Sequence, residues 1–157
     1  MIKIDGKIQL KEIIKSRPND ADLNDLDVSE IRNMSHLFYD SKFNGDISNW
    51  DVSNVKDMGY MFESSQFNGD ISNWDVSKVN DMRYMFQDSI FNGDISKWNV
   101  SNVNFMNYMF ENSKFNGDIS KWKFNKKVKL KEFMKGINSL KDLNKLKLGK
   151  FRKILDI

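Results

Sequence analysis

Cysteine is absent from the 157-residue chain, and the sequence has one proline and one histidine. Without cysteine there is no disulfide, no thiolate metal site and no cysteine nucleophile. One histidine cannot form a multi-histidine metal site within the chain. Apolar runs are only a few residues long, far short of the roughly 20 that span a bilayer. A hydrophobic content of 39% with 30% charged residues is typical of a globular protein.

A repeat of 24 residues dominates the sequence. The run Phe-Asn-Gly-Asp-Ile-Ser begins at Phe43 and recurs at Phe67, Phe91 and Phe115. Its full template is F-N-G-D-I-S-x-W-x-V-S-x-V-x-x-M-x-Y-M-F-x-x-S-x, and a degenerate unit precedes the first complete copy. A period of this length is typical of repeat proteins, in which each unit buries its apolar face against its neighbours.

Each unit divides into two predicted elements. Asn-Gly indicates a turn, and the following Asp-Ile-Ser-x-Trp predicts a strand of four or five residues. Ser53 is then expected to cap a short α- or 3₁₀-helix with an apolar stripe formed by Val55, Met58, Met61 and Phe62. Stacked units would form a parallel sheet with a helical face opposite, which is an α/β solenoid.

The chain is predicted to have three segments. Residues 1–18 form an N-terminal cap, with apolar residues at helical spacing and Pro18 ending the helix. Residues 19–135 hold five repeat units, of which the first and last are degenerate. Residues 136–157 are interpreted as a basic helical C-terminal cap.

The template W-D-V-S-N-V-x-x-M-x-x-M-F, read here from Trp50 to Phe62, resembles the BspA-like leucine-rich repeat family of bacterial surface proteins. The resemblance covers roughly residues 20–135. It implies a right-handed, leucine-rich-repeat-like solenoid that binds other proteins, often at a cell surface. The chain shows neither a signal peptide nor a lipid-anchor cysteine, and we therefore expect a cytoplasmic protein.

One acidic column runs through all five units. Its members are Asp22, Asp46, Asp70, Asp94 and Asp118. Each carboxylate could accept backbone N–H groups within its own Asn-Gly-Asp turn, which is the interpretation we favour. The alternative is a ladder of bound Ca²⁺. The sequence otherwise indicates no cofactor and no metal site.

Aromatic residues in one phase of the repeat are the first candidates for partner binding. They are His36, Tyr60, Tyr84 and Tyr108. They either form an exposed row that binds a protein or lie over neighbouring units and contribute only packing. Ile90 and Phe105 stand where sister units have polar residues. These two residues would form a local patch or cover the C-terminal cap.

Charge is unevenly distributed along the chain. Residues 1–110 hold 11 Lys/Arg and 17 Asp/Glu, a net −6, whereas residues 111–157 hold 14 and 5, a net +9. The basic candidates for partner binding are Lys121, Lys123, Lys126 and Lys127. These lysines form either a solvated cap or a surface that steers an acidic partner, such as nucleic acid, an anionic membrane or an acidic protein. Few aromatic residues accompany them, so specific recognition of nucleic acid is weakly supported.

No phosphate-binding loop, metal-ligand cluster or nucleophile–base pair is apparent in the sequence. We therefore predict a non-enzymatic protein-binding repeat module that acts through its solenoid surface. One alternative is a small cytosolic regulator or inhibitor, encoded by a phage or mobile element, that docks on a nucleic-acid-binding enzyme by charge complementarity. A second alternative is a surface adhesin-type repeat protein. The sequence identifies neither the protein partner nor the oligomeric state.

Overall fold

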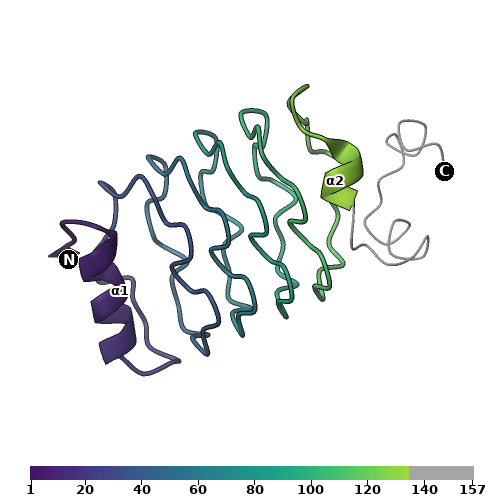
Figure 1. Ribbon diagram of the computed structural model, residues 1–157. Coiled ribbons are helices and arrows are strands. Elements are labelled where there is room, and N and C mark those ends of the chain that lie inside the picture. The colour runs from purple at the N-terminus through teal and green to yellow at the C-terminus, as the bar shows by residue number, and fades with distance from the viewer. Residues whose placement is uncertain (135–157) are drawn as a thin grey trace.

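The computed structural model describes residues 1–134, and Figure 1 shows them as a series of stacked coils. The regular elements of this range are β1 (Ile2–Lys3), α1 (Lys7–Ser16), β2 (Leu26–Asp27) and α2 (Leu130–Met134). The predicted C-terminal cap at 136–157 lies outside the described residues. No helix among the described residues is long and apolar enough to cross a membrane.

Helix α1 lies where the apolar spacing predicts a helix, and it ends before Pro18. Its buried residues are Leu10 and Ile14, which join the same core as the coils. Strand β1 pairs in parallel with β2, with Ile2 opposite Leu26. The N-terminal segment therefore adds a short strand and a helix to the first coil (Figure 1).

The expected α/β solenoid, a right-handed, leucine-rich-repeat-like stack of strands and helices, is wrong. From residue 28 to residue 129 the coils consist of turns, bends and isolated bridges. The described chain has two helices and one sheet, which contains two strands of two residues each. The prediction of helical caps at both ends is tested only at α1, because the C-terminal cap lies beyond the described range.

Two consecutive turns replace the expected strand of each unit. Asp46 Oδ1 accepts a hydrogen bond from Ser48 N at 2.8 Å, which turns the chain directly after Asp46. Trp50 N then donates to the carbonyl of Ile47 at 3.2 Å and closes a second turn. The same two bonds recur in the next three coils. The backbone therefore bends twice where an extended strand was expected.

Left-handed residues interrupt the expected helix of each unit. Tyr60 has a φ of 61°, and a right-handed helix cannot continue through such a residue. The amides of Met58, Tyr60 and Phe62 donate to carbonyls of the following coil at 2.8–2.9 Å, and not to their own segment. Ser53 is not a helix N-cap, because no helix follows it; its amide donates instead to Asp51 Oδ1 at 3.0 Å within a turn. Hydrogen bonding between coils thus takes the place of helical hydrogen bonding.

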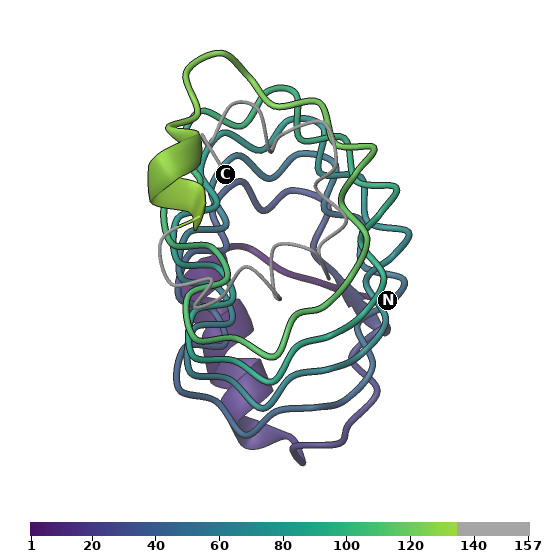
Figure 2. The same cartoon turned by 90° about the vertical axis from the view of Figure 1, so that its right-hand side faces the viewer.

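The core lies inside the coils as columns of identical side chains. Trp74 is buried, and its Nε1 donates to the carbonyl of Ile47 in the preceding coil at 3.2 Å. Phe62, Phe67 and Phe86 form part of a continuous aromatic stack, with neighbouring ring centroids 4.5 and 5.5 Å apart. Figure 2 shows the outlines of successive coils lying over one another, as this columnar packing requires. The buried side chains are thus shared between coils, and no coil has a core of its own.

One glycine is required by the closeness of two coils. At Gly45 a Cβ atom would clash with the carbonyl of Ala21 in the preceding coil. The amide of Asp46, the next residue, donates to that same carbonyl at 3.1 Å. A side chain at position 45 would therefore push the first two coils apart.

Candidate binding surface

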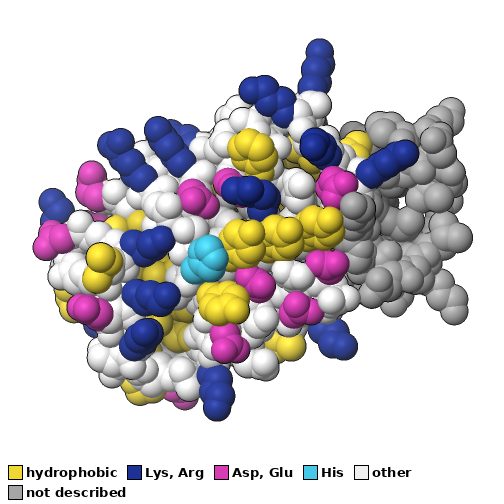
Figure 3. Space-filling view, viewed as in Figure 1, with side chains coloured by type: hydrophobic (Ala, Val, Ile, Leu, Met, Phe, Trp, Pro, Cys, Tyr) yellow, Lys and Arg dark blue, Asp and Glu magenta, His cyan; other side chains and the backbone are white. Residues whose placement is uncertain are grey.

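The stacked coils bring His36, Tyr60, Tyr84 and Tyr108 together as one line, which we call the aromatic row. Figure 3 shows the single histidine of the chain at one end of a line of hydrophobic side chains on the surface. Successive ring centroids are 4.6, 4.7 and 5.1 Å apart, and each pair lies within 14° of parallel. His36 is exposed, and the three tyrosines are half-buried. The row is therefore both packed, through its ring faces, and accessible, through its outer edge.

Each member of the aromatic row has a left-handed backbone. The φ angles are between 56° and 61°, a region that few residues other than glycine and asparagine adopt. This conformation costs an L-residue about 1–2 kcal/mol. Ring stacking contributes about 0.5–1.5 kcal/mol per pair beyond area burial, so it offsets much of that cost. Periodicity could not reveal this feature, because the template spacing was equally compatible with a short helix.

Two further aromatic side chains border the row. Tyr39 is 51% exposed, and its ring lies edge-on to His36 with the centroids 5.9 Å apart. Phe105 is 48% exposed, and the guanidinium of Arg83 lies 5.2 Å from its ring centroid. Tyr39 and Arg83 were missed by sequence reasoning, although Tyr39 replaces a polar residue of the template.

Ile90 is also exposed, but it belongs to a different column of the coils from Phe105. At the same position of the repeat, the preceding unit has Gln66 and the following unit has Lys114. The amide of Ile90 donates to the carbonyl of Ser65 at 3.4 Å. Phe105 instead continues the column of bridges that includes Asp81. Phe105 is linked to the aromatic row through Arg83, whose guanidinium lies over its ring and whose charge acts on Tyr84. Ile90 shows no such link among the described residues.

Two glutamates, Glu63 and Glu111, each stand three residues after a tyrosine of the row, at the same position of the repeat. Glu63 is half-buried, and burial together with the nearby Asp88 raises the pKa of its carboxyl group. Two coils further on, Glu111 Oε2 accepts a hydrogen bond from Gln87 Nε2 at 2.6 Å. Burial and the neighbouring tyrosines also raise the pKa of Tyr84, so its hydroxyl group is protonated at neutral pH.

Basic side chains gather at the histidine end of the row. Lys7 Nζ donates to Asn33 Oδ1 at 3.0 Å and to the carbonyl and hydroxyl oxygens of Ser35, which ties α1 to this end. Partial burial lowers the pKa of His36, and the positive charges of Lys7 and Lys11 lower it further. His36 is therefore neutral at physiological pH.

The carboxylates of the aspartate column form hydrogen bonds within turns. Asp46, Asp70 and Asp94 each accept a hydrogen bond from the amide two residues on, at 2.8–2.9 Å. These bonds hold the pKa of each carboxyl group below its ordinary value, and they outweigh the repulsion that Asp70 receives from its two neighbours. Among the described residues, no group of three or more His, Cys, Asp or Glu side chains could hold a metal ion.

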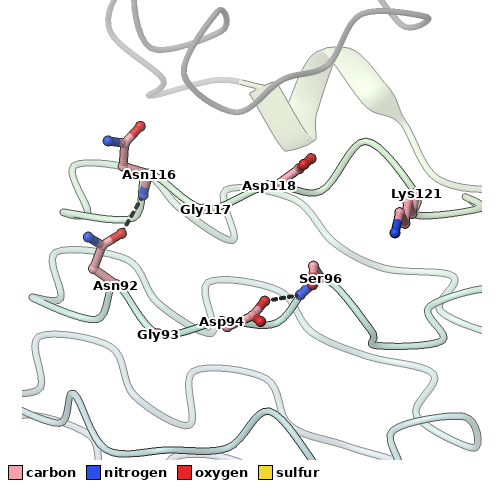
Figure 4. Close-up of a pocket in the computed structure, with 8 residues that line it drawn as sticks. All are labelled: Asn92, Gly93, Asp94, Ser96, Asn116, Gly117, Asp118 and Lys121. Atoms are coloured by element: carbon pink, nitrogen blue, oxygen red, sulfur yellow. Dashed lines mark hydrogen bonds between the residues drawn. The ribbon is translucent and has the colours of Figure 1, made fainter.

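The four candidate lysines are all exposed on the last coil. Lys121 lies beside a surface depression of about 390 Å³ that Asp94, Asn116 and Asp118 also line. Figure 4 shows how the polar groups there are used: Asn116 N donates to Asn92 Oδ1 at 2.7 Å, and Ser96 N donates to Asp94 Oδ1. Lys121 and Lys123 line a second depression of about 370 Å³. Several polar groups around these lysines are thus already engaged in hydrogen bonds that stabilise the coils.

Repeated coils with shared core columns define a repeat protein. The family described as "Mycoplasma protein of unknown function, DUF285" matches the chain twice, over residues 8–90 and 63–147. These matches extend over most of the sequence, and the chain belongs to this family. No curated protein and no solved structure matches it. The two overlapping matches agree with a repeat architecture, whereas membership of the BspA-like leucine-rich repeat family stays a prediction.

Proposed function

We propose that this protein is a non-enzymatic protein-binding repeat protein and that its partner binds on the aromatic row. The observation that carries the proposal is the row itself, a line of stacked rings with an accessible edge. Tyrosine is enriched at protein interfaces because it combines a large rigid ring with a polar tip. Two exposed aromatic side chains add to this surface: Tyr39 contacts His36, and Phe105 lies under the guanidinium of Arg83.

The left-handed backbone of the row supports a binding role over a purely structural one. Asparagine or glycine would relieve the backbone cost at each position, and Asn112 in the last complete unit takes a φ of 54° as such a residue can. The chain nevertheless places tyrosine at three of the four positions of the row. Binding through the ring edges and hydroxyl groups gives a reason for this choice.

The resemblance to BspA-like repeats points to the same class of function. That family consists of bacterial surface proteins whose repeats bind other proteins. We therefore place the chain with protein-binding repeats related to BspA-like proteins, and the coil geometry differs from the strands and helices that the resemblance implied.

The test replaces Tyr60, Tyr84 and Tyr108 together by asparagine, which accepts the left-handed backbone. Wild type, this triple variant and the control Ile8→Asn are immobilised, and proteins captured from lysate of the source cell are quantified by mass spectrometry. Ile8 is 77% exposed on α1, so its replacement changes a surface outside the row. A specific protein should bind wild type and the control but not the triple variant. Equal capture by a folded triple variant would refute the proposal.

A second candidate function follows from the exposed lysines of the last coil. In that case the protein is a regulator that docks on an acidic partner, including a nucleic-acid complex, by charge complementarity. The contacts would be made by Lys121, Lys123, Lys126 and Lys127. Binding of this kind weakens steeply with salt. A gel shift with duplex and single-stranded nucleic acid, repeated at rising salt, separates it from binding through the aromatic row.

A further inference from the structure

We infer that the partner contributes a basic segment and that an arginine of this segment binds at Glu63, against the edge of the aromatic row. The inference rests on the proposed function and names the chemistry of the partner. It is argued from an arginine that the surface already holds, from a carboxylate to which no described residue is bonded, and from the charge around the row.

The surface already holds one arginine between a carboxylate and an aromatic ring. Arg83 donates to Asp81 through Nε and Nη2, with the shortest contact 2.6 Å from Nη2 to Oδ2. Its guanidinium lies 5.2 Å from the centroid of Phe105. A planar guanidinium can bond a carboxylate in this way while it lies over a ring, which a lysine ammonium cannot do. Asp81 and Phe105 therefore show how this surface binds an arginine.

Glu63 offers a comparable carboxylate without an internal arginine. It closes a turn with the row, since its amide donates to the carbonyl of Tyr60 at 3.3 Å. Among the described residues, no hydrogen bond or ion pair reaches its carboxylate, and that group is not sealed from solvent. Glu111, in the same column, differs because Gln87 donates to it. Of the two glutamates at this repeat position, Glu63 is thus the one whose carboxylate is available to bind a partner.

The charge around Glu63 favours a cation. Burial, and after it the negative charge of Asp88, raises the pKa of the Glu63 carboxyl group, so a positive charge beside Glu63 would offset both effects. Figure 3 shows acidic side chains on both sides of the line of hydrophobic residues. Arg83, a basic residue whose charge acts on Tyr84, is already bonded to Asp81. An acidic partner would meet repulsion here, whereas an arginine would relieve it.

The experiment measures binding of a synthetic peptide with the repeated sequence Gly-Arg-Ser to the full-length protein by isothermal titration calorimetry. A peptide with citrulline in place of arginine keeps the shape and removes the charge. Glu63→Gln should weaken binding of the arginine peptide about tenfold, since a charge-assisted hydrogen bond contributes about that much. Glu111→Gln removes an equal charge from the same column and should change binding less than about twofold, a shift typical of screened surface charge.

Three results would overturn the inference: equal affinity of wild type and Glu63→Gln for the arginine peptide, equal binding of the citrulline peptide, or equal weakening by Glu111→Gln. Thermal unfolding of both variants confirms that each is folded before binding is compared. The natural partner, once captured, separates the two proposals. If its capture requires the row tyrosines but is unchanged in Glu63→Gln, this inference fails and the proposed function stands. If the tyrosines are also unnecessary, the proposed function fails.

Discussion

Replacing Tyr84 by alanine and by glycine measures the two opposing contributions of the aromatic row to stability. Both variants lose the stacking of Tyr84 on Tyr60 and on Tyr108, at 4.7 and 5.1 Å. At about 0.5–1.5 kcal/mol per pair, this loss destabilises the alanine variant by about 1–3 kcal/mol. The glycine variant loses the same contacts but also loses the left-handed strain at a φ of 57°.

The sign of the difference between the two variants is the informative quantity. At an ordinary position glycine is less stable than alanine by about 0.4–1 kcal/mol, because it has more freedom in the unfolded chain. At position 84 relief of about 1–2 kcal/mol of strain exceeds this term, so the glycine variant should be the more stable by about 0.5–1 kcal/mol. For a chain of this size that corresponds to about 2 °C in the thermal midpoint.

Urea unfolding followed by circular dichroism supplies the free energies. Tyr39 provides the matched control, because it touches the row but is not among the left-handed residues. Tyr39→Ala should be more stable than Tyr39→Gly, which is the reverse of the order at Tyr84. If alanine is the more stable residue at both positions, the left-handed geometry of the row is refuted.

Three other perturbations test the core and the acidic column. Trp74→Phe removes the hydrogen bond from Nε1 to the Ile47 carbonyl and should lower the free energy of unfolding in urea by about 1–3 kcal/mol. Trp74→Ala should lower it by about 3–5 kcal/mol, because the side chain is buried. A decrease below about 1 kcal/mol in the alanine variant would contradict the buried column. The pKa values of Asp46, Asp70 and Asp94 are lowered on folding, so their contribution to stability is present above the ordinary value of 3.8 and is lost as pH falls through the lower folded values. The thermal midpoint should accordingly decrease as the pH is lowered below about 4. A midpoint that stays constant or increases in that pH range would show that these turns do not stabilise the fold. Calcium should leave the midpoint unchanged at neutral pH, and a rise of many degrees would restore the calcium-ladder interpretation.

The periodic features of the fold could be predicted from the sequence. The period of 24 residues places Trp50 and Trp74 in one column, and both are buried in the structure. Helix α1 was accessible to prediction because its apolar spacing and Pro18 are local signals. Column positions depend only on the repeat, and they hold whatever conformation the backbone of each unit takes.

The backbone of each unit could not be predicted, because two conformations give the same spacing. Met58 and Met61 are three residues apart, which suits one face of a helix. In the structure they are the first and last residues of a turn in which Met61 N donates to the Met58 carbonyl at 3.2 Å, and the next turn begins at Tyr60. Successive turns thus direct apolar side chains inward at helical spacing. The left-handed tyrosines that decide between the two conformations carry no sequence signal of their own.

The candidate site was predicted in part for the same reason. The repeat alone places Tyr60, Tyr84 and Tyr108 in line, but their stacking depends on the distance between coils and the direction of the side chains. The roles of Arg83 and Glu63 follow from side chains of other coils that the period does not identify.

Deletion of one complete unit tests the central claim that the coils stack in register. Removing residues 67–90 joins two coils with every column preserved, whereas removing residues 67–78 shifts all following columns by half a unit. Nuclear magnetic resonance of the amide groups measures whether each shortened protein is folded. The full-unit deletion should give dispersed signals and a cooperative thermal transition, and the half-unit deletion should not. Equal behaviour of the two deletions, folded or unfolded, would contradict the stacked arrangement.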